Sequence, residues 1–161
     1  MKIAILYFSK TGKTERTAKV IEEGINKVEG IEVKAMNLDK VDYEFLDESK
    51  AVIFGTPTYY ANMTWQMKKW IDESRNCNLE GKLGAVFATA QYIGGGANVA
   101  MTTMINHFMV KGMLMYSGGS ALGQPYIHLG HVSIGDGNEK EDEVARVFGE
   151  RIGKKAKELF E

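Results

Sequence analysis

The fold of this chain is decided by Ile3-Ala4-Ile5-Leu6-Tyr7-Phe8 and, directly after it, Ser9-Lys10-Thr11-Gly12-Lys13-Thr14. Six apolar or aromatic residues in a row predict a strand buried in a parallel sheet. The turn that follows carries three hydroxyls and one glycine and leads into a helical pattern. Such a turn leaves free backbone N–H groups at a helix N-terminus, where the helix dipole also favours an anion. These residues therefore predict a pocket for a phosphate group.

The composition is that of an ordinary globular protein. The 161 residues are 44% apolar and 25% charged, which predicts a single domain over residues 1–161. A formal net charge of −1 gives no sign of a nucleic-acid partner. The single cysteine, Cys77, excludes an internal disulfide and favours a reducing cytoplasm. No apolar run reaches the ~18 residues of a membrane helix, so no membrane association is expected.

Strand and helix patterns alternate along the chain, which predicts a parallel sheet with helices on both faces. The expected strands are residues 3–8, 31–36, 51–54, 84–88 and 113–116. The expected helices are residues 14–27, 43–48, 63–74, 97–108 and 140–160, and residues 117–138 are expected to be irregular. Because residues 31–36 alternate apolar and polar, they fit an edge strand, and the five strands fit the order 2-1-3-4-5.

Ligands of such sheets bind beyond the carboxyl ends of the strands, where the order of the strands reverses. Three loops reach that edge, residues 9–14, 56–63 and 89–96, and they are expected to form one site.

Two common phosphate-binding loops do not fit the first turn. Gly12-Lys13-Thr14 resembles the end of a nucleotide P-loop, but that loop needs a glycine where this chain has Tyr7. A dinucleotide fingerprint needs three glycines, and this turn has one. A monophosphate held by the hydroxyls of Ser9, Thr11 and Thr14 and by backbone N–H groups remains. The Lys13 side chain is expected in solvent rather than on the phosphate.

Three segments carry a family resemblance. Ser9-x-Thr11-Gly12-x-Thr14 resembles the phosphate loop of flavodoxin-like FMN proteins. Gly55-Thr56-Pro57-Thr58-Tyr59-Tyr60-Ala61-Asn62-Met63 and Thr89-Ala90-Gln91-Tyr92-Ile93-Gly94-Gly95-Gly96 resemble the second and third loops of one branch. That branch is the tryptophan-repressor-binding-protein type of NAD(P)H:quinone oxidoreductase, with related NAD(P)H-dependent FMN reductases. The resemblance covers nearly the whole chain and implies a flavodoxin-like three-layer sandwich that binds FMN.

The resemblance also implies a set of site residues. Thr58, Tyr59 and Tyr60 would lie along one side of the flavin ring, and Gln91 and Tyr92 would edge its pyrimidine end. The candidate cofactor-binding residues are Ser9, Lys10, Thr11, Gly12, Lys13, Thr14, Pro57, Thr58, Tyr59, Tyr60, Asn62, Thr89, Ala90, Gln91, Tyr92, Gly94 and Gly95. No catalytic side chain is expected, because the flavin carries the chemistry.

No metal site is expected either. His128 and His131 have a spacing that could suit a metal, but they lie in a glycine-rich stretch with no third ligand indicated. Structural zinc usually takes about four protein ligands.

Two functions stay open. The resemblance favours an FMN-dependent oxidoreductase that passes electrons from NAD(P)H to quinones or similar small acceptors and assembles as a homo-oligomer, a dimer or a tetramer. The alternative is a flavodoxin-type one-electron carrier between redox proteins. Thr11 and Lys13 depart from the reductases, which often have an aromatic residue and a histidine there. The net charge of −1 counts against the carrier, because an acidic docking surface is expected of one.

Overall fold

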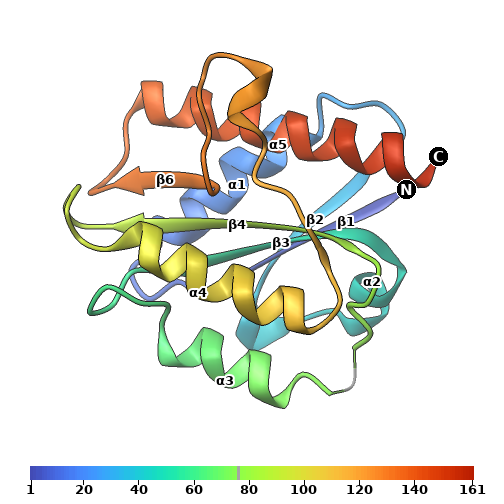
Figure 1. The fold of residues 1–161 in the computed structure, drawn as a ribbon, viewed down its shortest axis with the longest axis horizontal. Helices are drawn as coiled ribbons and strands as arrows, with labels where there is room; N and C mark the ends of the chain where they lie inside the picture. Colours follow the sequence, from blue (N-terminus) through green and yellow to red (C-terminus); the bar gives the residue numbers. More distant parts are fainter. Residues whose placement is uncertain (76) are drawn as a thin grey trace.

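A computed structural model describes residues 1–75 and 77–161 and shows a twisted sheet with helices on both faces (Figure 1). Its strands pair in parallel in the order β2-β1-β3-β4-β5, which confirms the predicted topology. The strands on this path are β1 (Lys2–Tyr7), β2 (Glu32–Asn37), β3 (Ser49–Pro57), β4 (Leu83–Ala90) and β5 (Leu114–Met115). All of their carboxyl ends therefore lie along one edge of the sheet.

The outermost strand is built from two pieces, which the sequence prediction missed. β5 pairs with Leu83 and Gly84 of β4, whereas β6 (His131–Ile134) pairs in parallel farther along the same strand. Residues 117–138, expected to be irregular, therefore contain a strand. A run of only four residues between glycines gives too little periodicity to be recognised.

The segment between β5 and β6 is held in place by one arginine of α5 (Glu139–Phe160). The guanidinium of Arg151 donates hydrogen bonds of 3.0–3.3 Å to the carbonyl oxygens of Gly118, Gly119, Gly123, Gln124 and Pro125. A planar fork of five N–H donors suits such a cluster of carbonyls. The 3-10 turn η2 (Ser120–Leu122) lies within this segment.

Two helical layers bury the sheet on both sides (Figure 1). Ile3 and Ile5 pack in one apolar layer with α1 and α5, and Ala4 and Leu6 pack in the other with α3 and α4, because successive strand residues point to opposite faces. The remaining helices are α1 (Lys13–Ile25), η1 (Leu38–Lys40), α2 (Tyr43–Glu48), α3 (Trp65–Glu73) and α4 (Ala97–Val110). Within the described ranges, no helix is both long enough and apolar enough to cross a membrane.

Candidate cofactor-binding site

The loops after β1, β3 and β4 enclose a cavity of about 270 Å³ at the carboxyl edge of the sheet, which we call the carboxyl-edge pocket. It brings together segments that lie far apart in the sequence, as the parallel topology predicted. Most of its lining comes from the predicted site residues: Lys10, Thr11, Lys13, Thr14, Pro57, Thr58, Tyr59, Thr89, Ala90 and Gln91.

The other predicted residues lie around the pocket rather than in its lining. Ser9 closes the first turn, because its Oγ accepts a hydrogen bond of 3.1 Å from the N–H of Gly12. Tyr60 and Tyr92 are exposed at the rim. The predicted residues outside the lining are Ser9, Gly12, Tyr60, Asn62, Tyr92, Gly94 and Gly95.

One lining residue was absent from the predicted set. Gly135 follows β6, and its N–H donates to the carbonyl oxygen of Ala90 at 2.8 Å, which brings a fourth loop to the pocket. The Gly135-Asp136-Gly137 turn is the signal that could have revealed it, but only once β6 is recognised as the strand before it.

Two helices that begin at this edge have glycine at the N-cap position. Gly12 precedes α1 and Gly96 precedes α4, both with φ of 89°, and neither helix has a side-chain cap among the residues described. In contrast, side chains of Asp42, Thr64 and Asn138 cap α2, α3 and α5. The first N–H groups of α1 are thus left for an anion, as at phosphate sites in other proteins.

A tight turn forms the second wall of the pocket. Tyr59 and Asn62 exchange backbone hydrogen bonds of 2.9 and 3.0 Å, and Tyr60 and Ala61 between them have φ of 48° and 57°. Two successive left-handed residues other than glycine are strained, so the surroundings must hold them. Gly96 supports this turn, because a Cβ placed on it would lie 2.4 Å from the Cβ of Ala61.

The side chain of Lys13 is not free in solvent, so that expectation is wrong. Its Nζ lies 2.9 Å from Oδ1 of Asp136 and 3.2 Å from Oε1 of Gln91. It therefore connects the first turn to both the third loop and the turn after β6. The hydrogen bond from Lys13 lowers the pKa of the exposed Asp136 carboxyl.

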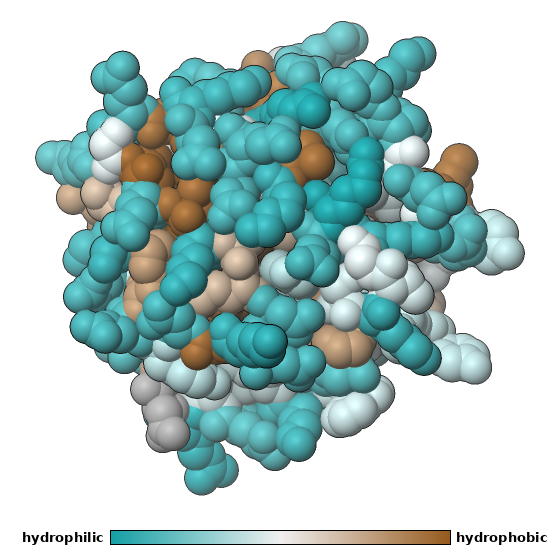
Figure 2. Space-filling view, turned by 180° about the vertical axis from the view of Figure 1, so that it is seen from behind, coloured by the Kyte–Doolittle hydropathy of each residue, from teal (hydrophilic) through white to brown (hydrophobic). Residues whose placement is uncertain are grey.

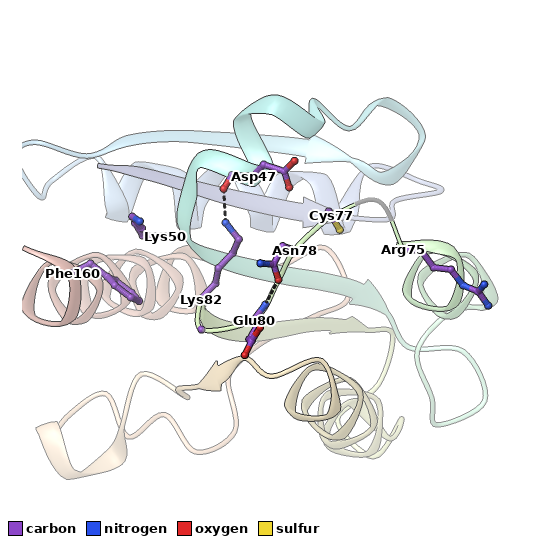
Figure 3. A pocket seen from close by; sticks show the side chains of 9 residues that line it. Asp47, Lys50, Arg75, Cys77, Asn78, Glu80, Lys82 and Phe160 are labelled. Carbon is purple, nitrogen blue, oxygen red and sulfur yellow. Dashed lines mark hydrogen bonds between the residues drawn. The ribbon is translucent and has the colours of Figure 1, made fainter.

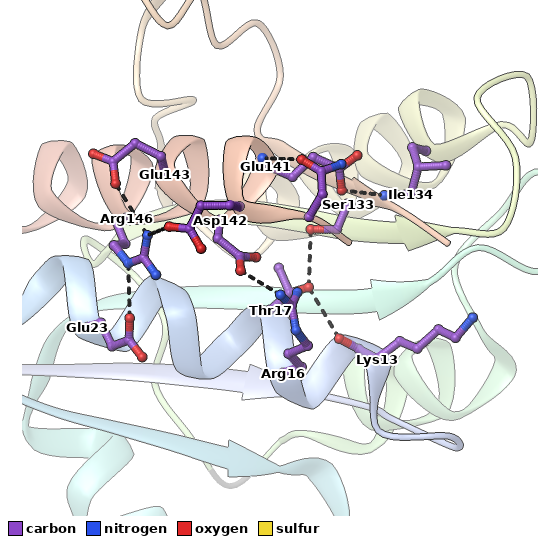
Figure 4. A network of polar contacts seen from close by, with 12 residues as sticks. Lys13, Arg16, Thr17, Glu23, Ser133, Ile134, Glu141, Asp142, Glu143 and Arg146 are labelled. Carbon is purple, nitrogen blue, oxygen red and sulfur yellow. Dashed lines mark hydrogen bonds and ion pairs between the residues drawn. The ribbon is translucent and has the colours of Figure 1, made fainter. Parts of the chain in front are cut away.

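Buried hydroxyls fasten the first turn of α1 to the sheet. Thr14 Oγ1 lies 2.8 Å from Thr89 Oγ1. Thr17 Oγ1 lies 3.2 Å from both Ser133 Oγ and the carbonyl oxygen of Lys13, and its single proton can be donated to one of them at a time (Figure 4). Ser133 Oγ in turn lies 2.9 Å from Nε2 of His131. These contacts fix the position of the helix N-terminus relative to β4 and β6.

His131 is a buried residue of β6, only 2% exposed, whereas His128 is exposed. Burial lowers the pKa of His131 to about 4, so its imidazole is neutral at neutral pH. Its Nδ1 has no hydrogen-bond partner within the described chain.

Two polar contacts join the elements behind the first turn of α1. Arg16 of α1 pairs with the largely buried Asp142 of α5 at 2.5 Å, and Glu141 accepts a 3.0 Å hydrogen bond from the N–H of Ile134 (Figure 4). The start of α5, the end of β6 and the first turn of α1 are thereby joined.

The lining fits a phosphorylated flavin. Thr58 lines the pocket, and its Oγ1, which is itself buried, has no hydrogen-bond partner among the described atoms. Pro57, Tyr59 and Ala90 offer apolar contact for a flat ring. The uncapped N-terminus of α1 offers donors to a phosphate.

A second hollow lies at the opposite edge of the sheet, where the strands begin (Figure 3). We call it the amino-edge hollow; its volume is about 600 Å³. Lys82 Nζ donates to the carbonyl oxygens of Leu46, Asp47 and Ser49 at 3.3, 2.7 and 2.5 Å. The lining consists of Asp47, Lys50, Arg75, Cys77, Asn78, Glu80, Gly81, Lys82 and Phe160.

Comparison with known proteins assigns the family. The family model described as Flavodoxin matches residues 5–145. This chain belongs to the flavodoxin family. A flavodoxin from Clostridium saccharobutylicum is 64% identical over 160 residues, which cover 99% of this chain and all of that relative.

Two solved structures show the same flavodoxin fold. The WrbA-like flavodoxin of Agrobacterium tumefaciens matches with a TM-score of 0.84 at 23% identity, over 98% of each chain. The Fusobacterium nucleatum flavodoxin bound to flavin mononucleotide matches with a TM-score of 0.72 at 16% identity, again over 98% of each chain.

The predicted NAD(P)H:quinone oxidoreductase activity is wrong. Identity of 64% along the whole chain is shared with a flavodoxin, whereas the WrbA-like protein is a distant structural neighbour that shows the fold alone. NAD(P)H as reductant finds no support in these relatives, and the carrier, the alternative from the sequence, is favoured. Thr11 and Lys13 were the local signals in this direction, since both depart from the reductase pattern.

Proposed function

We propose that this flavodoxin binds FMN in the carboxyl-edge pocket and carries electrons between redox proteins. The observation that carries the proposal is the uncapped N-terminus of α1 at a pocket where Thr58 Oγ1 is buried without a partner. The helix N-terminus offers hydrogen-bond donors to a phosphate, and a buried hydroxyl without a partner is typical of a site that a ligand completes. The high identity to a curated flavodoxin supports the same function.

The chain's contribution would be to bind and orient the cofactor. The backbone N–H groups after Gly12 and the hydroxyl of Thr11 would hold the phosphate, while Thr14 is already bonded to Thr89. Tyr59 and Gln91 would border the ring. Bound FMN supplies the transfer of one or two electrons.

The lining suits a carrier because it offers little acid–base chemistry. Among the described lining residues of the carboxyl-edge pocket there is no histidine, cysteine or carboxylate. A protein that only hands on electrons needs to hold the ring and shield it from water, not to deliver protons to a substrate. A cytoplasmic location is supported by the single cysteine, and homo-oligomerisation stays a prediction.

The test starts from the FMN-loaded protein. We expect no turnover of NADH or NADPH with benzoquinone above that of free FMN, and we expect dithionite-reduced protein to reduce ferric cytochrome c stoichiometrically. Sustained NAD(P)H:quinone turnover by the protein would overturn the proposal. Failure to retain FMN after gel filtration would overturn it as well.

A further inference from the structure

Three buried polar side chains lie in a row behind the first turn of α1. Thr17 and His131 are 2% exposed, and Ser133 is 4% exposed. Hydrophilic residues cover most of the face of the protein seen in Figure 2, whereas these three lie in the interior and need partners there. We call them the buried polar row. None of them lines the carboxyl-edge pocket, so any effect on a ligand bound there has to pass through other groups.

The buried polar row runs from β6 to the start of α1. Nε2 of His131 lies 2.9 Å from Oγ of Ser133, which lies 3.2 Å from Oγ1 of Thr17. Thr17 Oγ1 lies 3.2 Å from the carbonyl oxygen of Lys13, where the row ends (Figure 4). The peptide group that contains this carbonyl also contains the N–H of Thr14. That N–H belongs to the first turn of α1, and the first N–H groups of a helix have no partner within the helix.

One arrangement of the protons serves every contact of the row. The carbonyl of Lys13 can only accept, so the proton of Thr17 is donated to it, and the contact between the two hydroxyls is made by the proton of Ser133. The imidazole of His131 is neutral, and its Nδ1 has no hydrogen-bond partner among the described residues. Because a buried N–H without an acceptor is costly, the imidazole proton belongs on Nε2, which donates to Ser133. Hydrogen bonds aligned in this way strengthen one another.

We infer that the buried polar row positions the phosphate of FMN by polarising and orienting the peptide group between Lys13 and Thr14. When the carbonyl of a peptide group accepts a hydrogen bond, the N–H of the same group becomes a stronger donor. The start of α1 then offers a phosphate a stronger hydrogen bond. This inference rests on the proposed binding of FMN in the carboxyl-edge pocket. His131, Ser133 and Thr17 are therefore positioning residues, which act on the phosphate without touching it.

A second attachment holds the same peptide group. Oγ1 of Thr14 lies 2.8 Å from Oγ1 of Thr89 in β4, and both residues are buried. The row ties the carbonyl of this peptide group to β6, while the hydroxyl pair ties the residue that carries its N–H to β4. A donor that is fixed before the ligand arrives loses little conformational freedom on binding. The row should therefore raise the affinity for a flavin that carries a phosphate, and not for one that lacks it.

The test compares FMN with riboflavin, which is the same flavin without the phosphate. Both are titrated into FMN-free protein, and the quenching of flavin fluorescence gives the two dissociation constants. Thr17→Val keeps the shape of the side chain and removes its hydroxyl, so it should raise the dissociation constant of FMN about fivefold. The dissociation constant of riboflavin should stay within about twofold of the wild type. Thr17→Ser keeps the hydroxyl and should bind FMN within about twofold of the wild type.

Two further variants separate the row from a hydroxyl on a helix as such. Ser133→Ala breaks the row at its middle without changing α1, and it should raise the dissociation constant of FMN by a similar factor. Thr102 of α4 is exposed and donates the same kind of hydrogen bond as Thr17, to the carbonyl of Asn98 at 2.8 Å. Thr102→Val should therefore leave both dissociation constants unchanged.

Inorganic phosphate probes the same donors without the flavin ring. Titrated as a competitor of FMN, it should have an inhibition constant about fivefold higher with Thr17→Val than with the wild type. An unchanged inhibition constant, or equal weakening of FMN and riboflavin in Thr17→Val, overturns the inference and leaves the binding of FMN intact. A wild-type protein that binds neither flavin would contradict the proposed function itself.

Discussion

The two ends of the sheet differ in how their polar groups are satisfied. The amino-edge hollow is the larger, about 600 Å³ against about 270 Å³, and is lined by charged side chains. Lys82 is the least exposed charged residue of this lining, and its Nζ donates hydrogen bonds to three carbonyl oxygens of the chain itself. The carboxyl-edge pocket is smaller, but Thr58 Oγ1 and the start of α1 keep donors free there.

The larger and more highly charged hollow is therefore the one in which the chain pairs its own half-buried cation. Buried polar groups in proteins are nearly always paired, so an unpaired one inside a pocket indicates a ligand. At the amino edge, carbonyl oxygens of the chain itself accept the hydrogen bonds of Lys82. At the carboxyl edge, neither the first N–H groups of α1 nor Thr58 Oγ1 has such a partner among the described residues.

The largest difference in stability between the two edges should come from replacing one glycine by alanine at each of them. Gly96→Ala should lower the free energy of unfolding by about 4 kcal/mol, because the new methyl meets Ala61 at a positive φ. Gly81→Ala at the amino-edge hollow has a φ of +72° and no atom within 4 Å, so it should cost about 1 kcal/mol. Urea denaturation of both apoproteins checks this, and equal losses would show that the contact between the two loops contributes nothing.

Acid should lower the free energy of unfolding through His131, which lies in β6. Its pKa is about 4 when folded against an ordinary 6.5, so the unfolded chain binds the proton more readily and stability falls as pH drops through that window. Burial is the main cause, partly offset by Asp142. The loss at pH 4 should be roughly 3 kcal/mol.

His131→Asn isolates this contribution. Between pH 7 and 4, its free energy of unfolding should fall by roughly 3 kcal/mol less than that of the wild type. The His128→Asn variant, changed at an exposed histidine, should match the wild type. Urea midpoints measured between pH 7 and 4 compare the three. An unchanged slope in His131→Asn would show that this histidine is not the group that titrates.

Much of the fold could be predicted because its signals are local. The buried run at Ile3–Phe8 and the alternation of residues 31–36 place a central and an edge strand without knowledge of any partner. The three loops could be assigned to one site because each directly follows a strand of a parallel sheet. β6 was missed because its place depends on pairing with β4 and on Arg151, which orders the segment before it.

The predictions that were wrong depend on residues that lie far apart in the sequence. Lys13 reaches Gln91, 78 residues away, and Asp136, so no local pattern could place its side chain. The choice between reductase and carrier failed because both share the fold and the loop pattern. What separates them here is similarity spread over the whole chain.

Lysine substitutions should separate structure from binding. Lys82→Met removes the charged donor of three hydrogen bonds to carbonyl oxygens. Burial lowers the pKa of Lys82, so the cost of burying its charge already offsets part of the stabilisation that these hydrogen bonds provide. We expect a loss of about 2 kcal/mol in stability with unchanged FMN affinity. Lys13→Met breaks an exposed pair, so it should change stability by less than about 0.5 kcal/mol and weaken FMN about threefold. Chemical denaturation measures the stability of each variant, and flavin fluorescence titration measures its affinity for FMN. Loss of FMN affinity in Lys82→Met together with loss of stability in Lys13→Met would exchange the roles of the two edges.

The smallest effect concerns a single hydroxyl at each edge. Thr58→Val keeps the shape and removes a hydroxyl that has no partner in the described chain, so the apoprotein should be as stable as the wild type or slightly more stable. If FMN takes that hydrogen bond, its dissociation constant rises about tenfold, or about 1.4 kcal/mol. Ser49→Ala, at the start of β3, removes a hydroxyl already bonded to the carbonyl of Phe45 at 2.8 Å, so it should cost about 1 kcal/mol of stability and leave FMN affinity unchanged. A Thr58→Val protein that binds FMN normally but unfolds more easily would mean that this hydroxyl, like that of Ser49, serves the fold rather than the ligand.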